Sequence, residues 1–194
     1  MKNPFANPDI LFDADSHTYT YKKTGQKLIS VSTLLGKYKQ PFDEDGSILK
    51  KCAEKEGVTT DELKAKWEKI KVDACERGTL FHSQVEEFIK TKKIPDGPDK
   101  DIVEAFSKMK FKGKIFSEVL LYSIPDLIAG TTDLVELLPN NVINIFDFKT
   151  NKKLETYSPW GKRMLYPLSH IFDCNFNVYQ LQLSLYSYLL EEKG

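Results

Sequence analysis

Three short apolar segments separated by turn residues constrain the fold of this chain more than any other feature. Residues 115–124, 127–138 and 142–148 are rich in β-branched and aromatic side chains. Pro125-Asp126 separates the first two segments, and Pro139-Asn140-Asn141 separates the last two. Segments of this length and composition, bounded by proline and asparagine, are typical of consecutive strands joined by short turns. We therefore expect a three-stranded antiparallel meander.

Side-chain alternation along the third strand brings a carboxylate and an ammonium group together. Successive strand residues point to opposite faces of a sheet, so Asp147 and Lys149 share one face while Phe148 packs on the other. The pair could be a simple surface salt bridge. The neighbours Ile145 and Phe146 favour a largely buried strand instead, and a buried carboxylate requires a partner.

The register of the meander decides whether further acids join this pair. If the second turn is centred on Asn140, Asp133 lies directly opposite Asp147. If the first turn is centred between residues 125 and 126, Glu118 lies directly opposite Asp133. Such a row of like charges destabilises a sheet unless a cation binds it, and carboxylate oxygens suit Mg²⁺ or Mn²⁺. The alternative is that Glu118 is an ordinary exposed strand acid and Asp133 lies at a solvated edge.

The residues before the meander predict a hairpin and then helices. Alternation between residues 10 and 30, with a turn at Lys23-Thr24-Gly25, indicates the hairpin. Ser30 offers a hydroxyl cap to a short helix that follows it. Residues 47–72 are rich in Lys and Glu and predict one or two surface helices with a break near Gly57.

Two further helices and a long loop complete the predicted elements. One helix is expected after Gly78-Thr79 and ends near Lys93. Its apolar positions recur at helical spacing, namely Phe81, Val85, Phe88 and Ile89. Residues 150–175 predict a polar and aromatic loop, and residues 176–190 a final helix.

The balance of charges means that any nucleic-acid surface must be local. Lys plus Arg number 28, and Asp plus Glu also number 28, so the bulk charge does not favour a phosphate-rich partner. Within the loop 150–175, aromatic rings could stack on unpaired bases while cations hold phosphates. The candidate residues there are Lys152, Lys153, Trp160, Lys162 and Arg163. The alternative is that these side chains only pack the loop.

Cysteine usage and the N-terminus predict the compartment. Cys52, Cys75 and Cys174 are too few and too widely spaced for a disulfide framework or a metal knuckle. The first residues carry no apolar run of the kind found in signal peptides, and no stretch approaches membrane-spanning length. We expect a cytoplasmic protein without a membrane partner.

Five short motifs occur in a characteristic order. They are Gly78-Thr79-Leu80-Phe81-His82 with Glu86, Glu118, Gly130-Thr131-Thr132-Asp133, Asp147-Phe148-Lys149-Thr150, and Gln182-Leu183-Ser184-Leu185-Tyr186. Together they resemble the motifs of RecB-like members of the PD-(D/E)XK nuclease superfamily, especially phage-encoded exonuclease-like members. The resemblance implies an α/β (α+β) fold with a restriction-endonuclease-like core, in which helices flank a central mixed sheet that contains the meander. It places this core at residues 76–194, preceded by an N-terminal hairpin and helical elaboration at 1–75.

The resemblance also implies which side chains hold a metal ion. His82, Asp133 and Asp147 resemble the family's ligands, and the backbone carbonyl of Phe148 would complete the inner shell. Glu118 is similar to the family's upstream acid. Taken without the resemblance, His82 would be a structural histidine at the boundary of an amphipathic helix.

Three further residues resemble catalytic or supporting groups. Lys149 looks like the catalytic lysine of the family. Gln182 and Tyr186 resemble the motif that supports this lysine and the substrate strand, and Gln180 competes with Gln182 for the motif position.

The resemblance implies a Mg²⁺- or Mn²⁺-dependent deoxyribonuclease, of the exonuclease kind, that acts on single- or double-stranded DNA. A phage-encoded member would work in the cytoplasm of its bacterial host. Iron–sulfur members of the family use four cysteines, and the three here do not match that pattern, so no iron–sulfur cluster is expected. Two alternatives stay open: a catalytically inactive nucleic-acid-binding or protein-interaction module on the same fold, and a non-nuclease metal hydrolase on an unrelated meander. The oligomeric state is left open.

Overall fold

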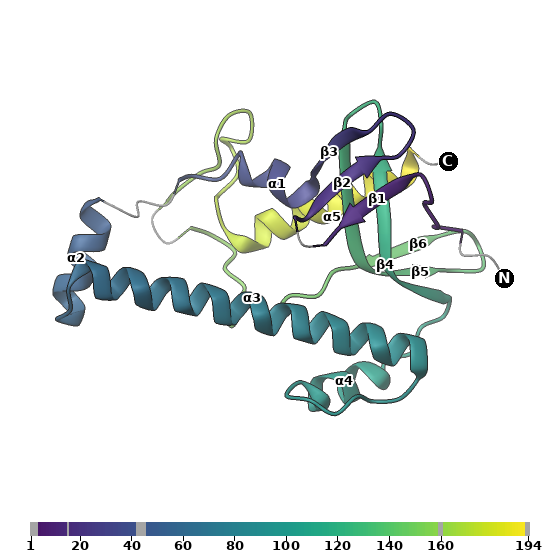
Figure 1. The fold of residues 1–194 in the computed structure, drawn as a ribbon, viewed down its shortest axis with the longest axis horizontal. Coiled ribbons are helices and arrows are strands. Elements are labelled where there is room, and N and C mark those ends of the chain that lie inside the picture. The colour runs from purple at the N-terminus through teal and green to yellow at the C-terminus, as the bar shows by residue number, and fades with distance from the viewer. Residues whose placement is uncertain (1–3, 15, 42–45, 159–160, 193–194) are drawn as a thin grey trace.

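The protein folds as an open mixed sheet flanked by helices, an α+β arrangement (Figure 1). The computed structural model describes residues 4–14, 16–41, 46–158 and 161–192. Its strands are β1 (Ile10–Asp13), β2 (Thr18–Tyr21), β3 (Gln26–Ser30), β4 (Lys114–Ser123), β5 (Ile128–Leu137) and β6 (Ile143–Phe146). Its helices are α1 (Val31–Gly36), α2 (Ser47–Glu56), α3 (Thr60–Thr91), α4 (Lys100–Ser107) and α5 (Asn175–Glu191).

The sheet is organised around β5, whose two sides have different partners. On one side β4 pairs antiparallel along the whole strand. On the other side β3 pairs in parallel at Ile128 and Ala129, and β6 pairs antiparallel at residues 134–137. Residues 130–133 lie between these two partners, and within the described part of the chain no strand pairs with them on that side. The sheet therefore has a gap beside the middle of β5.

The predicted meander and its register are confirmed. In β4 and β5, the pairs Ser117–Leu134 and Val119–Thr132 flank Glu118 and Asp133, which places those two acids opposite one another. In β5 and β6 the last pair is Leu134–Phe146. Continuing that register by one residue brings Asp133 opposite Asp147, which follows directly after β6.

The face to which side chains point changes at the position of the two opposed acids. Val135 packs in the cluster with α5, and Thr132 lies on the same side because it pairs with Val119 of that cluster, although strict alternation would separate Thr132 from Val135. Glu118, directly opposite, has a left-handed backbone with φ of 49°, which is uncommon for a residue other than glycine. A local irregularity in both strands therefore turns Asp133 and Leu134 toward the same helix, α3.

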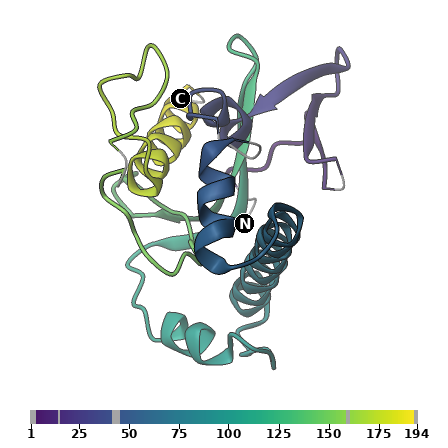
Figure 2. The same ribbon diagram turned by 90° about the vertical axis from the view of Figure 1, so that its left-hand side faces the viewer.

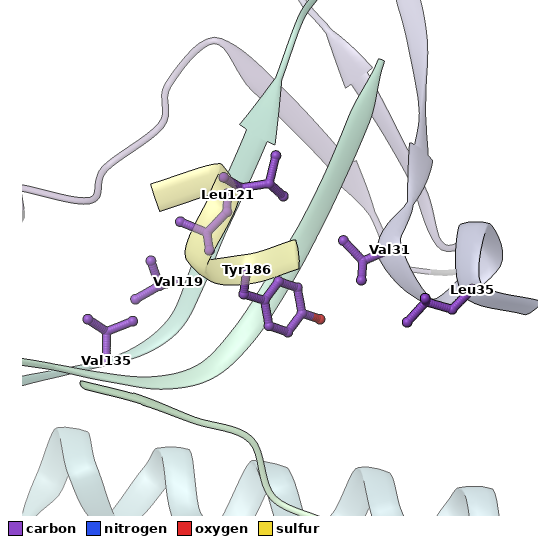
Figure 3. Close-up of a cluster of buried hydrophobic side chains, with 7 residues drawn as sticks. Val31, Leu35, Val119, Leu121, Val135 and Tyr186 are labelled. Carbon is purple, nitrogen blue, oxygen red and sulfur yellow. The ribbon is translucent and has the colours of Figure 1, made fainter. Parts of the chain in front are cut away.

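One face of the sheet is covered by α5 and the start of α1. The buried residues of this cluster are Val31, Leu35, Val119, Leu121, Val135, Tyr186 and Leu189. Figure 3 shows Tyr186 of α5 beside β4 and β5, with Val31 and Leu35 approaching from α1. This core anchors α5 against the gap in the sheet, since Tyr186 lies next to Gly130.

The opposite face is shared by α3, α4 and the N-terminal strands (Figure 2). Toward one end, α3 and α4 bury Phe81, Val85, Val103 and Phe106 against Leu134 of β5. Toward the other end, β1, β2 and β3 bury Ile10, Tyr19 and Leu28 against Ala129. The space between these two clusters lies over Glu118 and Asp133.

The helical region differs from the sequence prediction. A separate helix after Gly78 was expected, but α3 runs without interruption from Thr60 to Thr91, as Figure 1 shows. A capping box at Thr59 and Glu62 starts the helix, and the left-handed Lys92 ends it before Pro95. One glycine inside a helix costs only about 1 kcal/mol, and the good helix formers on both sides outweigh it. The break predicted near Gly57 is confirmed, because Gly57 ends α2 in a left-handed conformation.

The other predicted elements agree with the structure, with two additions. The hairpin is β2 and β3, and β1 adds a strand to it. Ser30 caps α1 by accepting a hydrogen bond from the Thr33 amide at 3.0 Å. The final helix α5 is confirmed. The short helix α4 was not predicted, and its buried Val103 and Phe106 supply part of the core.

The predicted division of the chain stays a prediction. The boundary between residues 75 and 76 falls within α3, and β3 from the first part pairs with β5 from the second. None of the helices in the described ranges has the length and apolar character needed to cross a lipid bilayer.

Candidate metal and hydrolytic site

A cavity of 720 Å³ lies over the gap in the sheet. Its walls come from the N-terminal strands, the start of α1, the C-terminal part of α3, strands β4 and β5, the segment after β6, and α5. The motif residues that line it are Gly78, Thr79, His82, Glu86, Glu118, Gly130, Thr131, Asp133, Asp147, Lys149, Gln182 and Tyr186. All five sequence motifs therefore meet in one place.

Asp133 lies at the centre of this site. Its carboxylate is 8% exposed, and its Oδ1 atom is 3.0 Å from Nδ1 of His82. Its Oδ2 atom accepts a hydrogen bond from the Phe148 amide. This second contact ties the segment after β6 to the middle of β5, where the ladder between the two strands has ended.

His82, Glu118 and Asp133 form a compact set of potential metal ligands. One donor atom from each residue lies within 4.8 Å of the donor atoms of the other two. The hydrogen bond to Asp133 raises the pKa of His82, because the carboxylate stabilises the imidazolium form. This group could hold a metal ion, which would take the place of the proton shared between His82 and Asp133.

Glu118 carries the most perturbed carboxyl group of the site. Removal of water by the cavity walls raises its pKa to about 7, and the nearby carboxylates of Asp133 and Glu86 contribute to the rise. The side chain is nevertheless accessible from the cavity. Because its ionised form is destabilised and its side chain is accessible, this acid is a suitable ligand for a cation.

Asp147 belongs to a second, adjoining network. Its side chain is 6% exposed and lies 2.5 Å from Nζ of Lys149. Burial raises the pKa of Asp147, as does the charge of Asp133, and the contact with Lys149 acts in the opposite direction. Asp147 and Lys149 are in contact as predicted, but β6 ends at Phe146, so they lie beyond the strand on which they were expected. Phe148 packs between Phe81 and Phe106.

Gln182 connects the members of this network. Its Oε1 accepts from Lys149 Nζ at 3.1 Å, and its Nε2 donates to Asp147 Oδ1 at 3.3 Å and to the Tyr186 hydroxyl at 3.0 Å. These contacts place Gln182 in the site, whereas Gln180 is exposed and does not line the cavity. Tyr186 is 4% exposed, and burial raises its pKa, so its hydroxyl stays protonated.

The gap in the sheet explains how α5 reaches the carboxylates. α5 packs on the face opposite to α3, yet Gln182 and Tyr186 line the same cavity as His82. Gly130 makes this approach possible, because a Cβ atom there would lie 2.7 Å from the Tyr186 ring. The site is therefore assembled from both sides of the sheet through the space left between β3 and β6.

The described residues among those predicted to guide a nucleic-acid strand do not line the cavity. Lys153 pairs with Glu155 at 2.9 Å, and Arg163 donates to the His170 carbonyl and lies over the Phe172 ring at 4.5 Å. Lys152 and Lys162 do not line the cavity either, and Trp160 lies outside the described residues. Both contacts of Arg163 lie within the loop 150–175, and its predicted role in binding a strand stays a prediction.

Sequence reasoning missed the contribution of the N-terminal strands. Phe12, His17 and Tyr19 line the cavity opposite α3, as do Ser30 and Ser32 at the start of α1. None of these residues was predicted for the site. No local pattern signals this contribution, because it depends on the parallel pairing of β3 with β5.

Tyr179 adds a further partner for the lysine. Lys149 Nζ lies 4.7 Å from the centre of the Tyr179 ring, whose hydroxyl is bonded to Asn151. Tyr179 was not among the residues predicted for the site. Together with Asp147 and Gln182, it fixes the ammonium group from three directions.

Neither a family model, nor a curated protein, nor a solved structure matches this chain. The chemistry of the site therefore rests on its own residues and their geometry.

Proposed function

We propose that this protein is a metal-dependent nuclease that hydrolyses the phosphodiester bonds of DNA, built on a restriction-endonuclease-like core of the RecB-like type. The observation that carries the proposal is the convergence of two networks in one cavity. A histidine and two acids, His82, Glu118 and Asp133, lie beside a lysine held by Asp147 and Gln182. Cations and acids in this combination suit the hydrolysis of a phosphate ester.

The donor set fits a divalent metal ion. His82, Glu118 and Asp133, whose donor atoms lie close together, would hold it, and Asp147 and the Phe148 carbonyl are the further ligands that the sequence predicts. The charge of Asp133 contributes to the raised pKa values of Glu118 and Asp147, and a bound cation would relieve this repulsion. Oxygen-rich sites of this kind favour Mg²⁺ or Mn²⁺. When bound, such an ion polarises a phosphoryl oxygen and lowers the pKa of a coordinated water.

Besides the metal ion, the side chain of Lys149 supplies positive charge to the site. Its ammonium group reaches the cavity from beside Asp147, where it can donate to a phosphate oxygen and stabilise the negative charge that builds up during hydrolysis. Gln182 orients the lysine, and the buried Tyr186 orients Gln182. These two residues act through Lys149 and position it.

An inactive binding module explains the site less well. Such a module gains nothing from placing like charges close together in a partly buried position, since each costs free energy without a cation. The proposal therefore assigns catalysis to the cavity, with exonuclease activity as the expected mode.

The test is cleavage of defined DNA substrates. The protein is incubated with linear and circular, single- and double-stranded DNA in Mg²⁺ or Mn²⁺, and products are resolved on denaturing gels. We expect degradation of linear DNA that EDTA abolishes and that Asp147→Ala and Lys149→Ala each reduce by at least about 100-fold. Lys71→Ala, which alters an exposed lysine of α3 outside the cavity, should leave cleavage unchanged.

The outcome decides between the candidate functions. Binding of DNA without cleavage would identify the inactive module and refute the nuclease. Near-normal cleavage by Lys149→Ala in Mn²⁺ would refute the role given to the lysine. Cleavage of closed circular DNA would refute the exonuclease mode and retain the nuclease.

A further inference from the structure

Aromatic side chains form a wall of the cavity that the proposed hydrolysis does not use. Phe12 and Tyr19 are directly paired residues of β1 and β2, and their rings stack with centroids 4.7 Å apart and planes 27° apart. The His17 ring meets Phe12 edge to face at 5.3 Å. All three residues line the same cavity as Asp133 and Lys149.

Phe12 lies where the buried part of β1 ends. Ile10, two residues earlier on the same face of the strand, is only 6% exposed, whereas Phe12 is 41% exposed. Leu11 points to the other face and does not line the cavity. Phe12 therefore presents an apolar aromatic surface to the cavity, which costs free energy in water until a ligand covers it.

Tyr19 fixes this aromatic surface relative to the carboxylates. Tyr19 is 2% exposed, and its hydroxyl is 3.1 Å from Oγ1 of Thr131. Thr131 precedes Asp133 by two residues in β5, which is about 7 Å along a strand. The stacked rings and Asp133 are therefore both held by β5, close to one another.

The wall has the chemistry of a base-binding surface. The cavity residues from β1, β2 and their turn are Phe12, Ala14, His17 and Tyr19, so this part of the described wall contains neither lysine nor arginine to hold a phosphate. Planar rings instead favour the face of a nucleobase, and every base has such a face. In a duplex these faces are covered by neighbouring bases.

The exposed Phe12 ring can stack on a base only if neighbouring bases do not cover the face of that base, which favours a single strand over a duplex. We propose that Phe12, supported by Tyr19 and His17, stacks on an unpaired base next to the phosphate at the acids, so that the site takes single-stranded DNA. This inference rests on the proposed function, because it concerns the strand to be cleaved.

Binding in the absence of metal tests the inference without cleavage. A fluorescent single-stranded oligonucleotide, the same strand with abasic positions, and the corresponding duplex are titrated in EDTA, and anisotropy gives each affinity. The wild-type protein should prefer the intact strand over the abasic strand by about 10-fold, as expected for stacking on one base. Phe12→Leu, which keeps apolar contact with Tyr19 but removes the ring, should abolish this preference, and Phe12→Trp should keep it.

Leu11→Ala is the matched control, since it alters an exposed residue of the same strand that faces away from the cavity. It should leave the preference unchanged. Thermal unfolding of each variant identifies any that fail to fold. Equal affinity of the wild-type protein for intact and abasic strands, or an unchanged preference in a folded Phe12→Leu variant, would overturn the inference.

Cleavage measured in parallel separates this inference from the nuclease proposal. If Asp147→Ala abolishes cleavage but Phe12→Leu keeps the preference for bases, only the stacking inference is wrong. If the wild-type protein cleaves nothing but loses base preference on Phe12→Leu, only the nuclease proposal is wrong.

Discussion

At the scale of single residues, the site is a set of charges that the chain has only partly neutralised. Asp133 is balanced by His82, and Asp147 by Lys149. Among the described residues, no ion pair with Glu118 is formed, and burial together with the charges of Asp133 and Glu86 raises its pKa to about 7. Such an excess of carboxylates over positively charged partners is expected at a site that binds a cation.

Gln182 should prove to be a positioning residue. Gln182→Ala removes the contacts that hold Lys149, Asp147 and the Tyr186 hydroxyl, and we expect kcat to fall by roughly 10- to 100-fold, with a smaller change in KM. Gln180→Ala, on the exposed side of α5, is the control and should stay within about twofold of wild type. Steady-state kinetics on a linear substrate measures both. Equal losses in the two variants would contradict the assignment of the motif position.

The raised pKa of Glu118 predicts how stability depends on pH. Between its ordinary value near 4.5 and its folded value of about 7, the folded protein binds a proton that the unfolded chain has released. The metal-free protein should therefore lose stability as pH rises through this range. His82, whose pKa is also raised, contributes with the same sign.

Glu118→Gln isolates the contribution of this acid. Because the amide does not ionise, the variant should gain stability over the wild-type protein as pH rises from about 4.5 to about 7, with little difference between them below this range. Urea unfolding midpoints measured in EDTA across that range provide the comparison. Parallel pH profiles for the two proteins would show that Glu118 titrates normally.

At the scale of elements, the site depends on departures from regular structure. The left-handed backbone at Glu118 and the changed alternation at Asp133 aim both acids into the cavity. Such strained positions often mark functional sites. α3 is by contrast regular through Gly78, where only Thr150 Oγ1 would lie near an added Cβ, at 3.7 Å.

Two glycine substitutions should therefore have opposite effects on stability. Gly78→Ala places a better helix former at a position with room for it, and the free energy of unfolding should rise by about 0.5–1 kcal/mol. Gly130→Ala forces a Cβ to within 2.7 Å of the Tyr186 ring and 3.1 Å of Val31, and it should cost about 1–3 kcal/mol. Chemical denaturation of both variants tests this. A stable Gly130→Ala protein would mean that α5 does not approach β5 closely.

At the scale of the whole molecule, the sheet is incomplete at the place where chemistry is proposed. β3 and β6 pair with different parts of the same side of β5. The gap between these two strands leaves room for side chains from both faces of the sheet. Segments from residue 12 to residue 186 meet there. A ligand bound in this position would connect the N-terminal strands, α3, the central strands and α5.

A metal ion should accordingly stabilise the entire fold. Mn²⁺ at 100 times its dissociation constant would raise the free energy of unfolding by about 2.7 kcal/mol, which corresponds to roughly 5–11 °C in Tm for a chain of this size. Asp133→Asn removes the central carboxylate and should abolish most of the shift. Thermal scans with and without Mn²⁺ measure the effect, and an equal shift in both proteins would place the ion elsewhere. Because His82 must lose its proton to bind a metal, the shift should shrink as pH falls.

Local sequence patterns determined the parts of the structure that depend on neighbouring residues. Period-two alternation and two turns located the meander and its register, and therefore placed Glu118, Asp133 and Asp147 opposite one another. A hydroxyl cap located α1 at Ser30. The continuity of α3 through Gly78 was beyond the same reasoning, since it depends on the sum of many small helix propensities rather than on one residue.

Only the tertiary structure decided which distant segments meet at the acids. The parallel pairing of β3 with β5 brought Phe12 and His17 into the cavity, and the gap before β6 let Gln182 pass from the opposite face. Contacts between residues so far apart in the chain have no local signature, because they depend on how apolar faces of separate elements find one another. The charges of the site were visible in the sequence, whereas the shape of the space around them was not.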